Sequence, residues 1–293
     1  MKSSAPRKAQ PSGAAPKKPA GRASSSPGRP SILVLFQDLI ASFTAPGFWL
    51  YGARIDTSIR YRSQALGALW MVIGTLAFVL LLGTLYSQVL RVNSELYFAH
   101  IAAGYVLWRF VQQSLAQSTT VYKKNLAMIQ NGYVRYPDYV LREVASQLIN
   151  FGYNLLIVVG AVLLTPVQVT IVDLVLLLTL PLFLLSVLGG CLLLSVVGAR
   201  YPDFGELVRT LLQLFFFLTP IIWMPTGSGK GDILGAFLYA NPFYYLIEIV
   251  RGPLVYGHIP WFEIGVVMAA VPLMWLLAAL AYARAKPYIP LWI

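Results

Sequence analysis

Long apolar runs are the feature that most restricts what this chain can fold into. Residues 66–90 carry no charge, and residues 171–197 carry only Asp173, near the start of the run. Each run exceeds the ~20 residues with which a helix crosses ~30 Å of hydrocarbon. Charged residues make up only 11% of the chain, against about 25% in soluble domains. We therefore predict an all-α polytopic membrane protein.

Six segments are predicted to span the membrane as transmembrane helices, within a transmembrane domain over residues 64–286. They are residues 66–90, 97–121, 139–164, 169–197, 207–224 and 262–283. Residues 31–63 mix apolar, aromatic and charged residues, which predicts amphipathic helices lying in the membrane interface. Residues 233–257 are apolar but are interrupted by two prolines, which predicts a re-entrant segment before the last span. Residues 287–293 are predicted to form a short cytoplasmic C-terminus.

The basic residues predict the orientation of the spans. With both termini in the cytoplasm, 18 of the 22 Lys and Arg residues fall on the inner side, in agreement with the positive-inside rule. Seven of these lie in residues 1–30, which are rich in Pro, Ser and Ala and contain no acidic residue. This composition predicts a disordered basic tail in the cytoplasm. The tail either contacts anionic headgroups or stays solvated, and the net charge of +11 does not argue for nucleic acid as a partner.

Residues 225–232, PTGSGKGD, have the glycine and lysine content of a phosphate-binding loop. A Walker A loop requires G-x-x-x-x-G-K-[ST]. Here Met224 occupies the position of the first glycine, and Gly231 stands where the hydroxyl residue belongs. The segment also falls on the predicted outer side, away from cytoplasmic ATP. We therefore interpret it as a flexible turn and expect no nucleotide or other cofactor on this chain.

The reactive side chains form no recognisable catalytic or metal-binding motif. His100 and His258 have no cysteine or carboxylate at metal-ligand spacing, and both fall near the predicted outer boundary. Cys191 is the single cysteine and lies in an apolar run, so it cannot form an internal disulfide. The sequence therefore favours binding and movement of a cargo over bond-making chemistry.

Polar residues recur at helical spacing within two of the predicted spans. In the second span they are Arg109, Gln113, Gln117 and Thr120, and in the third Glu143, Gln147, Asn150 and Asn154. Spacings of three and four place each set on one face of its helix. Arg109 lies near mid-depth, where a charge costs ~2.5–3.5 kcal/mol, so we expect it to face protein or water. The two stripes either line a translocation path or form hydrogen bonds between helices.

Aromatic residues accompany the first two predicted spans and the outer loop between them. They are Tyr86, Tyr97, Phe98, Tyr105 and Trp108. Aromatic faces stack on sugar rings, which makes these residues candidates for a path that carries a glycan. Trp and Tyr also form belts at membrane interfaces, and the pattern does not separate the two roles.

Four segments resemble, in the same order, segments of the ABC-2 type export permeases. They are YRSQALGALW (61–70), KKNLAMIQNGYVRYPDYVL (123–141), ARYPDFGELVRTLLQLFFFLTPIIW (199–223) and NPFYYLIEIVRGPL (241–254). Within that family the chain looks most like the exporters of O-antigen, teichoic acid, capsule or galactan. The basic, proline-rich tail is not a usual feature of the family, so the resemblance gives it no role.

The resemblance implies a homodimer that works with two separate ATPase subunits, which would bind ATP and Mg. It also implies a location in the bacterial inner membrane and a polyprenyl-diphosphate-linked glycan as cargo. The segment that docks into the ATPase would contain Lys123, Lys124, Tyr133, Arg135, Tyr136 and Pro137. The re-entrant helix would contain Asn241, Pro242, Glu248 and Arg251, with Glu248 and Arg251 paired at a spacing of three.

Three arginines near the predicted inner boundary are candidates for recognising the lipid diphosphate. They are Arg54, Arg60 and Arg62, and arginine matches phosphate geometry. The alternative is that they only anchor the chain by the positive-inside rule. Two other functions stay open: export of a small molecule or drug by the same fold, and a membrane-bound glycan-modifying enzyme such as an acyltransferase.

Overall fold

The computed structural model describes residues 32–62, 67, 69–90, 94–132, 134–168, 170–224 and 233–293. The predicted tail at residues 1–30, the predicted turn at 225–232 and Tyr133 lie outside this part of the chain. The described residues form helices and connecting turns, with no strand among them, which confirms the all-α prediction. The elements are α1 (Leu33–Thr44), α2 (Gly47–Tyr61), α3 (Leu69–Leu90), α4 (Ser94–Ser118), α5 (Val121–Lys124), α6 (Leu126–Gln130), α7 (Tyr136–Leu164), η1 (Ile171–Val175), α8 (Leu176–Arg200), α9 (Phe204–Leu218), α10 (Ile233–Ala240), α11 (Pro242–Arg251), η2 (Gly252–Tyr256), α12 (Trp261–Ala285) and α13 (Ile289–Trp292).

Within the described residues, four helical segments are long and apolar enough to span a membrane. They are Leu69–Tyr86, Tyr136–Leu164, Ile171–Arg200 and Trp261–Ala285. The pair α1 and α2 would add a fifth only as a single broken span, because the two helices meet at an angle of 70°. These segments correspond to the predicted spans one, three, four and six.

The other two predicted spans do not have this simple form. α4 has 25 residues, but its polar stripe lowers its apolar content below that of a lipid-facing span. α9 ends at Leu218, six residues before the predicted end of its span, because Thr219 precedes Pro220 and adopts an extended backbone with ψ 134°. Its 15 residues reach only ~22 Å. The count of six spans therefore remains a prediction.

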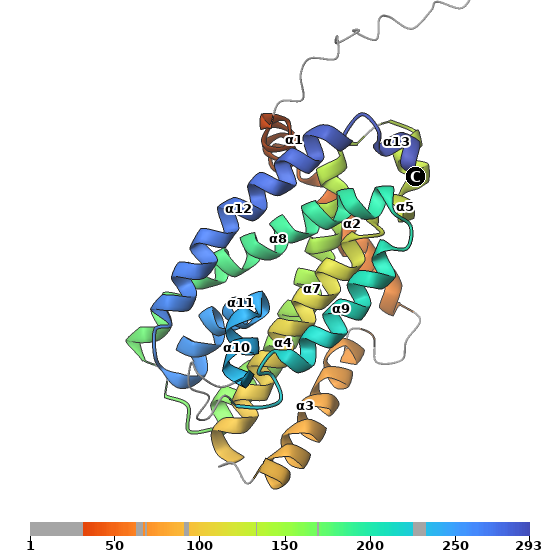
Figure 1. Ribbon diagram of the computed structural model, residues 1–293. Helices are drawn as coiled ribbons and strands as arrows, with labels where there is room; N and C mark the ends of the chain where they lie inside the picture. The colour runs from red at the N-terminus through yellow and green to blue at the C-terminus, as the bar shows by residue number, and fades with distance from the viewer. Residues whose placement is uncertain are drawn as a thin grey trace, which may run out of the picture. The chain divides into compact units, whose positions relative to one another are not determined.

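α4 lies at the centre of the bundle, against α3, α7, α8, α9 and α11 (Figure 1). Most of its side chains are buried, and a helix surrounded by protein does not need a continuous apolar surface. α8 and α12 run side by side, whereas α3 packs mainly on α4 and α7 at the edge of the bundle. The polar character of α4 is thus accommodated by its position.

Close packing fixes the C-terminal end of α4 against α8. A Cβ atom at Gly198 of α8 would overlap the carbonyl group of Thr119, which directly follows α4. Small residues at such contacts allow helix backbones to approach each other in membrane proteins. The contact holds the junction between α4 and α5 against α8.

The segment predicted as re-entrant forms two short helices, α10 and α11, followed by the π-helical turn η2. Asn241 separates α10 from α11, and its side chain caps α11 by accepting a hydrogen bond from the Phe243 amide at 3.0 Å. Pro242 occupies the first turn of α11, where its missing N–H is not needed. α11 packs on α4, α8 and α12, so the broken backbone is covered by protein.

Candidate functional site

The polar stripes of α4 and α7 face each other across one cavity. It has a volume of about 110 Å³. Its lining comes from α2 and α3 as well as α4 and α7, and consists of Arg60, Met71, Arg109, Gln113, Gln117, Gln147, Asn150 and Asn154. Arg109, Gln113, Gln117, Asn150 and Asn154 were all candidates for the path, and the fold brings them together. We call this space the polar cavity.

The hydrogen bonds of the α7 stripe run along that helix. Gln147 Nε2 donates to Glu143 Oε1 at 2.9 Å, Asn150 Nδ2 to Gln147 Oε1 at 3.3 Å, and Asn154 Nδ2 to the Asn150 carbonyl at 2.7 Å. No hydrogen bond in the described part of the chain joins the α7 stripe to the α4 stripe. The polar groups therefore line a space between the helices and do not tie the helices together.

The polar cavity carries positive charge that its own lining does not neutralise. Arg60 and Arg109 line it, and no carboxylate does. Within the described residues neither guanidinium forms an ion pair or a side-chain hydrogen bond. The Oδ1 atoms of Asn150 and Asn154 are buried and also lack a partner there. Two free guanidinium groups beside carboxamides can bind an anion and hydrogen-bond to hydroxyl groups.

A second, larger cavity of about 470 Å³ adjoins the first at Arg60, which lines both. Its walls come from α2, α5, α6 and α7 and include Lys124, Asp56 and Arg142. Arg142 binds Asp56 through two hydrogen bonds of 2.7 and 2.6 Å, which join α7 to α2. Lys124 Nζ donates to Gln117 Oε1. The cationic segment after α4 is therefore in direct contact with the lining of the polar cavity.

Of the three arginines predicted to recognise a lipid diphosphate, the structure places one at the cavities. Arg60 lines both of them. All three side chains are exposed, but Arg54 and Arg62 line neither cavity. Arg54 lies six residues and Arg62 two residues from Arg60, spacings that turn their side chains to other faces of a helix.

The predicted path aromatics lie away from the polar cavity. Tyr97 is buried and donates a 2.5 Å hydrogen bond to the Ile222 carbonyl. Trp108 is buried against Phe216 and Phe243, because it is adjacent to Arg109 and so points about 100° away from it. Of the remaining three, Tyr86 is exposed, Phe98 lines an apolar groove, and Tyr105 stacks on Phe78 with 4.3 Å between ring centroids.

Comparison with known families identifies the chain. Residues 49–255, more than two thirds of the sequence, match the family model described as ABC-2 type transporter. The chain belongs to the ABC-2 type transporter family. Members of this family are membrane subunits of transporters and work with ATPase subunits. The matched region contains all the residues that line the polar cavity.

One relative of known function is similar to most of this chain. The chain is 24% identical over 237 residues to the O-antigen export system permease protein RfbA of Myxococcus xanthus. The alignment covers 76% of this chain and 86% of RfbA. The relative is thus matched over nearly its full length and not over one segment.

The predicted coupling segment of this ABC-2 chain comprises α5, α6 and the start of α7. Arg135 is exposed, and its Nη1 donates to the Ala41 carbonyl of α1 at 2.9 Å. Tyr136 lies edge-on to Tyr122 at 5.8 Å between ring centroids. Burial raises the pKa of Tyr122 well above its ordinary value, so that hydroxyl stays neutral.

The other predicted coupling residues differ in the exposure of their side chains. Pro137 is buried in the first turn of α7, where proline suits the start of a helix. Lys123 is half-buried and Lys124 is exposed. Of this set, the lysines and Arg135 therefore present charge at the surface, while Pro137 and Tyr136 help to fix the position of α7.

The predicted pairing of Glu248 with Arg251 is confirmed. Arg251 is only 1% exposed, and its Nη2 lies 2.5 Å from Glu248 Oε2. Its Nη1 donates to the Pro220 carbonyl at 2.5 Å and lies 3.4 Å from His100 Nε2. His100 Nδ1 in turn lies 2.6 Å from the hydroxyl of Tyr256. We call these four side chains the ionic cluster.

His100 is the member of this cluster that the sequence did not reveal. The expected position was the outer boundary, but the side chain is fully buried. It is 151 residues from Arg251 in the chain, so no local spacing could connect them. A histidine and an arginine, each isolated within an apolar segment, are the one signal that could have suggested a contact.

Proposed function

We propose that this chain is the permease subunit of an ATP-driven exporter of polysaccharide linked to a polyprenyl diphosphate. The cargo would move from the cytoplasmic to the outer side of the bacterial inner membrane. The observation that carries this proposal is the polar cavity, where Arg60 and Arg109 face carboxamides without a neutralising carboxylate among the residues that line it. Arginine binds phosphate well, and the carboxamides match the hydroxyl groups of sugars. The printed description of RfbA as an O-antigen export permease supports a glycan.

The assembly that we propose is a homodimer with two ATPase subunits, which bind ATP and Mg. Six spans with both termini in the cytoplasm would include α4 and α9, and α10 with α11 would form the re-entrant segment. The 25 residues of α4 reach ~37 Å, enough to cross the hydrocarbon. Its polar side chains face α7 across the polar cavity, so they need not meet lipid.

The coupling would start at residues 123–137, where the ATPase docks. Lys124 of α5 contacts Gln117 at the polar cavity, and Arg142 ties α7 to α2 through Asp56. Movement of α5 would therefore act on the lining of the polar cavity through the contact of Lys124 with Gln117, while the Arg142–Asp56 pair holds α7 and α2 together. Arg60 lies between the two cavities, where it would receive the diphosphate before Arg109 does.

The test is reconstitution of this chain with an ABC ATPase subunit from the same organism. We expect ATP hydrolysis by the complex and ATP-dependent movement of a lipid-linked glycan across the bilayer of proteoliposomes. The isolated permease should hydrolyse no ATP. Movement of small hydrophobic compounds, with no movement of lipid-linked glycan, would instead identify a small-molecule exporter of the same fold.

A further inference from the structure

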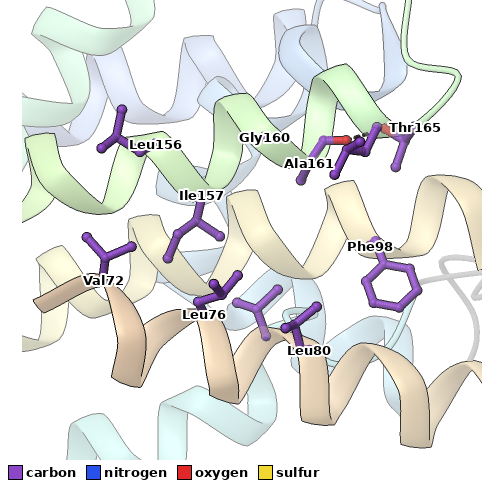
Figure 2. Close-up of a pocket in the computed structure, with 11 residues that line it drawn as sticks. Val72, Leu76, Leu80, Phe98, Leu156, Ile157, Gly160, Ala161 and Thr165 are labelled. Atoms are coloured by element: carbon purple, nitrogen blue, oxygen red, sulfur yellow. Dashed lines mark hydrogen bonds between the residues drawn. The ribbon is translucent and has the colours of Figure 1, made fainter. Parts of the chain in front are cut away.

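An apolar groove of about 520 Å³ lies between α3, α4 and α7, and its shape and chemistry suit a hydrocarbon chain. Figure 2 shows side chains from α3 and α7 on its two sides, with Phe98 of α4 near one end. Val72, Leu76 and Leu80 supply the α3 side. The one side-chain hydroxyl in the lining, on Thr165, donates to the Ala161 carbonyl at 2.7 Å.

Gly160 makes part of this groove open. It lines the groove, and a Cβ atom built at this position would have nothing within 4 Å. Its neighbour Val159 is 54% exposed and is not part of the lining. A side chain added at Gly160 would therefore enter the groove, whereas the same side chain at Val159 would point elsewhere.

The groove begins where the polar cavity ends, on the same two helices. On α3, Met71 lines the polar cavity and Val72 lines the groove. On α7, Asn154 lines the cavity and Ile157, almost one turn further on, lines the groove. Asn154 and Ile157 are three residues apart, which places them on the same face of α7. They lie ~4.5 Å apart along the helix axis, so one ligand can reach from the cavity into the groove.

The two spaces together have the chemistry of an anionic lipid. The cavity offers the free guanidinium groups of Arg60 and Arg109, and the groove offers ~12 Å of apolar wall between Val72 and Leu80. A helix from a second copy of the chain could cover the groove, but it would leave both guanidinium groups without a counter-charge. A lipid phosphate with its attached chain satisfies the cavity and the groove together.

We infer that the groove between α3, α4 and α7 holds the polyisoprenoid chain of the cargo lipid while its diphosphate lies at Arg60 and Arg109. This inference rests on the proposed function and names the part of the cargo that the groove receives. In the proposed orientation Arg60 lies near the inner boundary, and the groove runs from there towards the outer end of α3. A lipid of the inner leaflet has the same direction, with its phosphate at the surface and its chain towards the bilayer centre.

The test uses the full-length chain with its ATPase partner in nanodiscs of neutral phosphatidylcholine. The probe is a polyisoprenyl diphosphate with a diazirine in its chain, and the matched probe is the corresponding uncharged alcohol. We expect light-induced labelling of residues 72–80 and 156–165, stronger for the diphosphate than for the alcohol. Gly160→Trp should weaken binding of the diphosphate by about tenfold, because the indole occupies space that the chain needs; the control, Val159→Trp, should bind as the parent protein does.

The other outcomes distinguish failure of this inference from failure of the proposed function. If the diphosphate probe binds with full affinity but labels other helices, and Gly160→Trp does not weaken its binding, the groove is not the site of the lipid chain. The proposal of a lipid-linked cargo would still stand. Equal displacement of the probe by phosphatidylglycerol would also overturn it, since the groove would then accept any anionic lipid. Disulfide cross-linking of two copies through Gly160→Cys would assign the groove to a protein interface. No binding of the diphosphate by the parent complex would instead overturn the proposed lipid cargo.

Discussion

Two arginines within the helical bundle, Arg109 and Arg251, have opposite surroundings. Arg251 is 1% exposed and is held by the Glu248 carboxylate, the Pro220 carbonyl and His100. Arg109 lines a cavity without a carboxylate and has no hydrogen bond or ion pair to the described residues. A buried charge is costly unless it is paired. The protein provides the partner at Arg251. Arg109 is only partly buried, so its guanidinium can stay charged and unpaired until a ligand binds.

The two regions also differ in what they do to the helices around them. The ionic cluster joins α4, α11 and η2 to the Pro220 carbonyl after α9 through short contacts. The polar cavity lies beside the packed contact between α4 and α7, and the hydrogen bonds of its α7 wall stay within that helix. The first arrangement stabilises one packing of the helices, and the second leaves polar groups without protein partners at the edge of a packed helix pair.

The largest effect that we expect is loss of stability in Arg251→Met. This change leaves the Glu248 carboxylate buried without its partner, which should destabilise the fold by about 3–5 kcal/mol. The measurement is the thermal unfolding of the purified chain in detergent. The double variant Glu248→Leu with Arg251→Met should recover much of the loss, since it leaves no uncompensated charge. An unchanged melting temperature in Arg251→Met would show that the ionic cluster does not stabilise the packing.

A smaller effect of a different kind is expected for Arg109→Leu. Removing a charge-assisted contact to the cargo costs about 1.5–3 kcal/mol, which corresponds to a loss of transport of roughly ten- to a hundredfold. The melting temperature should stay the same or rise, because no protein partner loses its counter-charge. Transport is measured in proteoliposomes with the ATPase, and Arg109→Lys is the control that keeps the charge. Full transport by Arg109→Leu would show that Arg109 contributes only to helix packing and does not bind the cargo.

The smallest effect concerns Arg135, an arginine at the surface. It is exposed and donates to the Ala41 carbonyl, so its replacement should change stability by less than about 1 kcal/mol. In the proposed assembly Arg135→Glu should still weaken co-purification of the ATPase, because it reverses the charge at the docking segment. Arg54→Glu is the matched control, exposed on α2 outside that segment. Unchanged co-purification and transport would remove Arg135 from the interface.

Local patterns in the sequence predicted much of this structure. Apolar runs located the helices α3, α7, α8 and α12, and the three- and four-residue spacing placed Arg109 with Gln113 and Gln117 on one face. The pairing of Glu248 with Arg251 followed from their spacing of three residues. Each of these features depends on residues that are neighbours along one helix.

Features that depend on distant residues were not accessible in this way. Nothing local indicates that Arg60, from α2, lies at the same cavity as Asn154, or that His100 meets Arg251. The sequence also predicted that α9 extends to residue 224, whereas the helix ends at Leu218. A residue before proline disfavours helical backbone, so the Thr219-Pro220 pair was a local signal for this end. It outweighs the apolar composition of residues 219–224. The face of Trp108 was ambiguous because an aromatic residue suits both a protein core and a membrane interface.

The most direct test of the difference between the two regions is to give the polar cavity a protein counter-charge. Met71 lines that cavity and is 4% exposed, so Met71→Glu places a carboxylate beside Arg60 and Arg109, which will favour its ionised form. ATP-driven transport of the lipid-linked glycan is then compared with that of Met71→Gln, which has nearly the same size but no charge. We predict that Met71→Glu assembles with the ATPase but transports at least about tenfold less than Met71→Gln, a difference of ~1.4 kcal/mol. Equal transport by the two variants would contradict the claim that the free arginines of the polar cavity bind the anionic cargo.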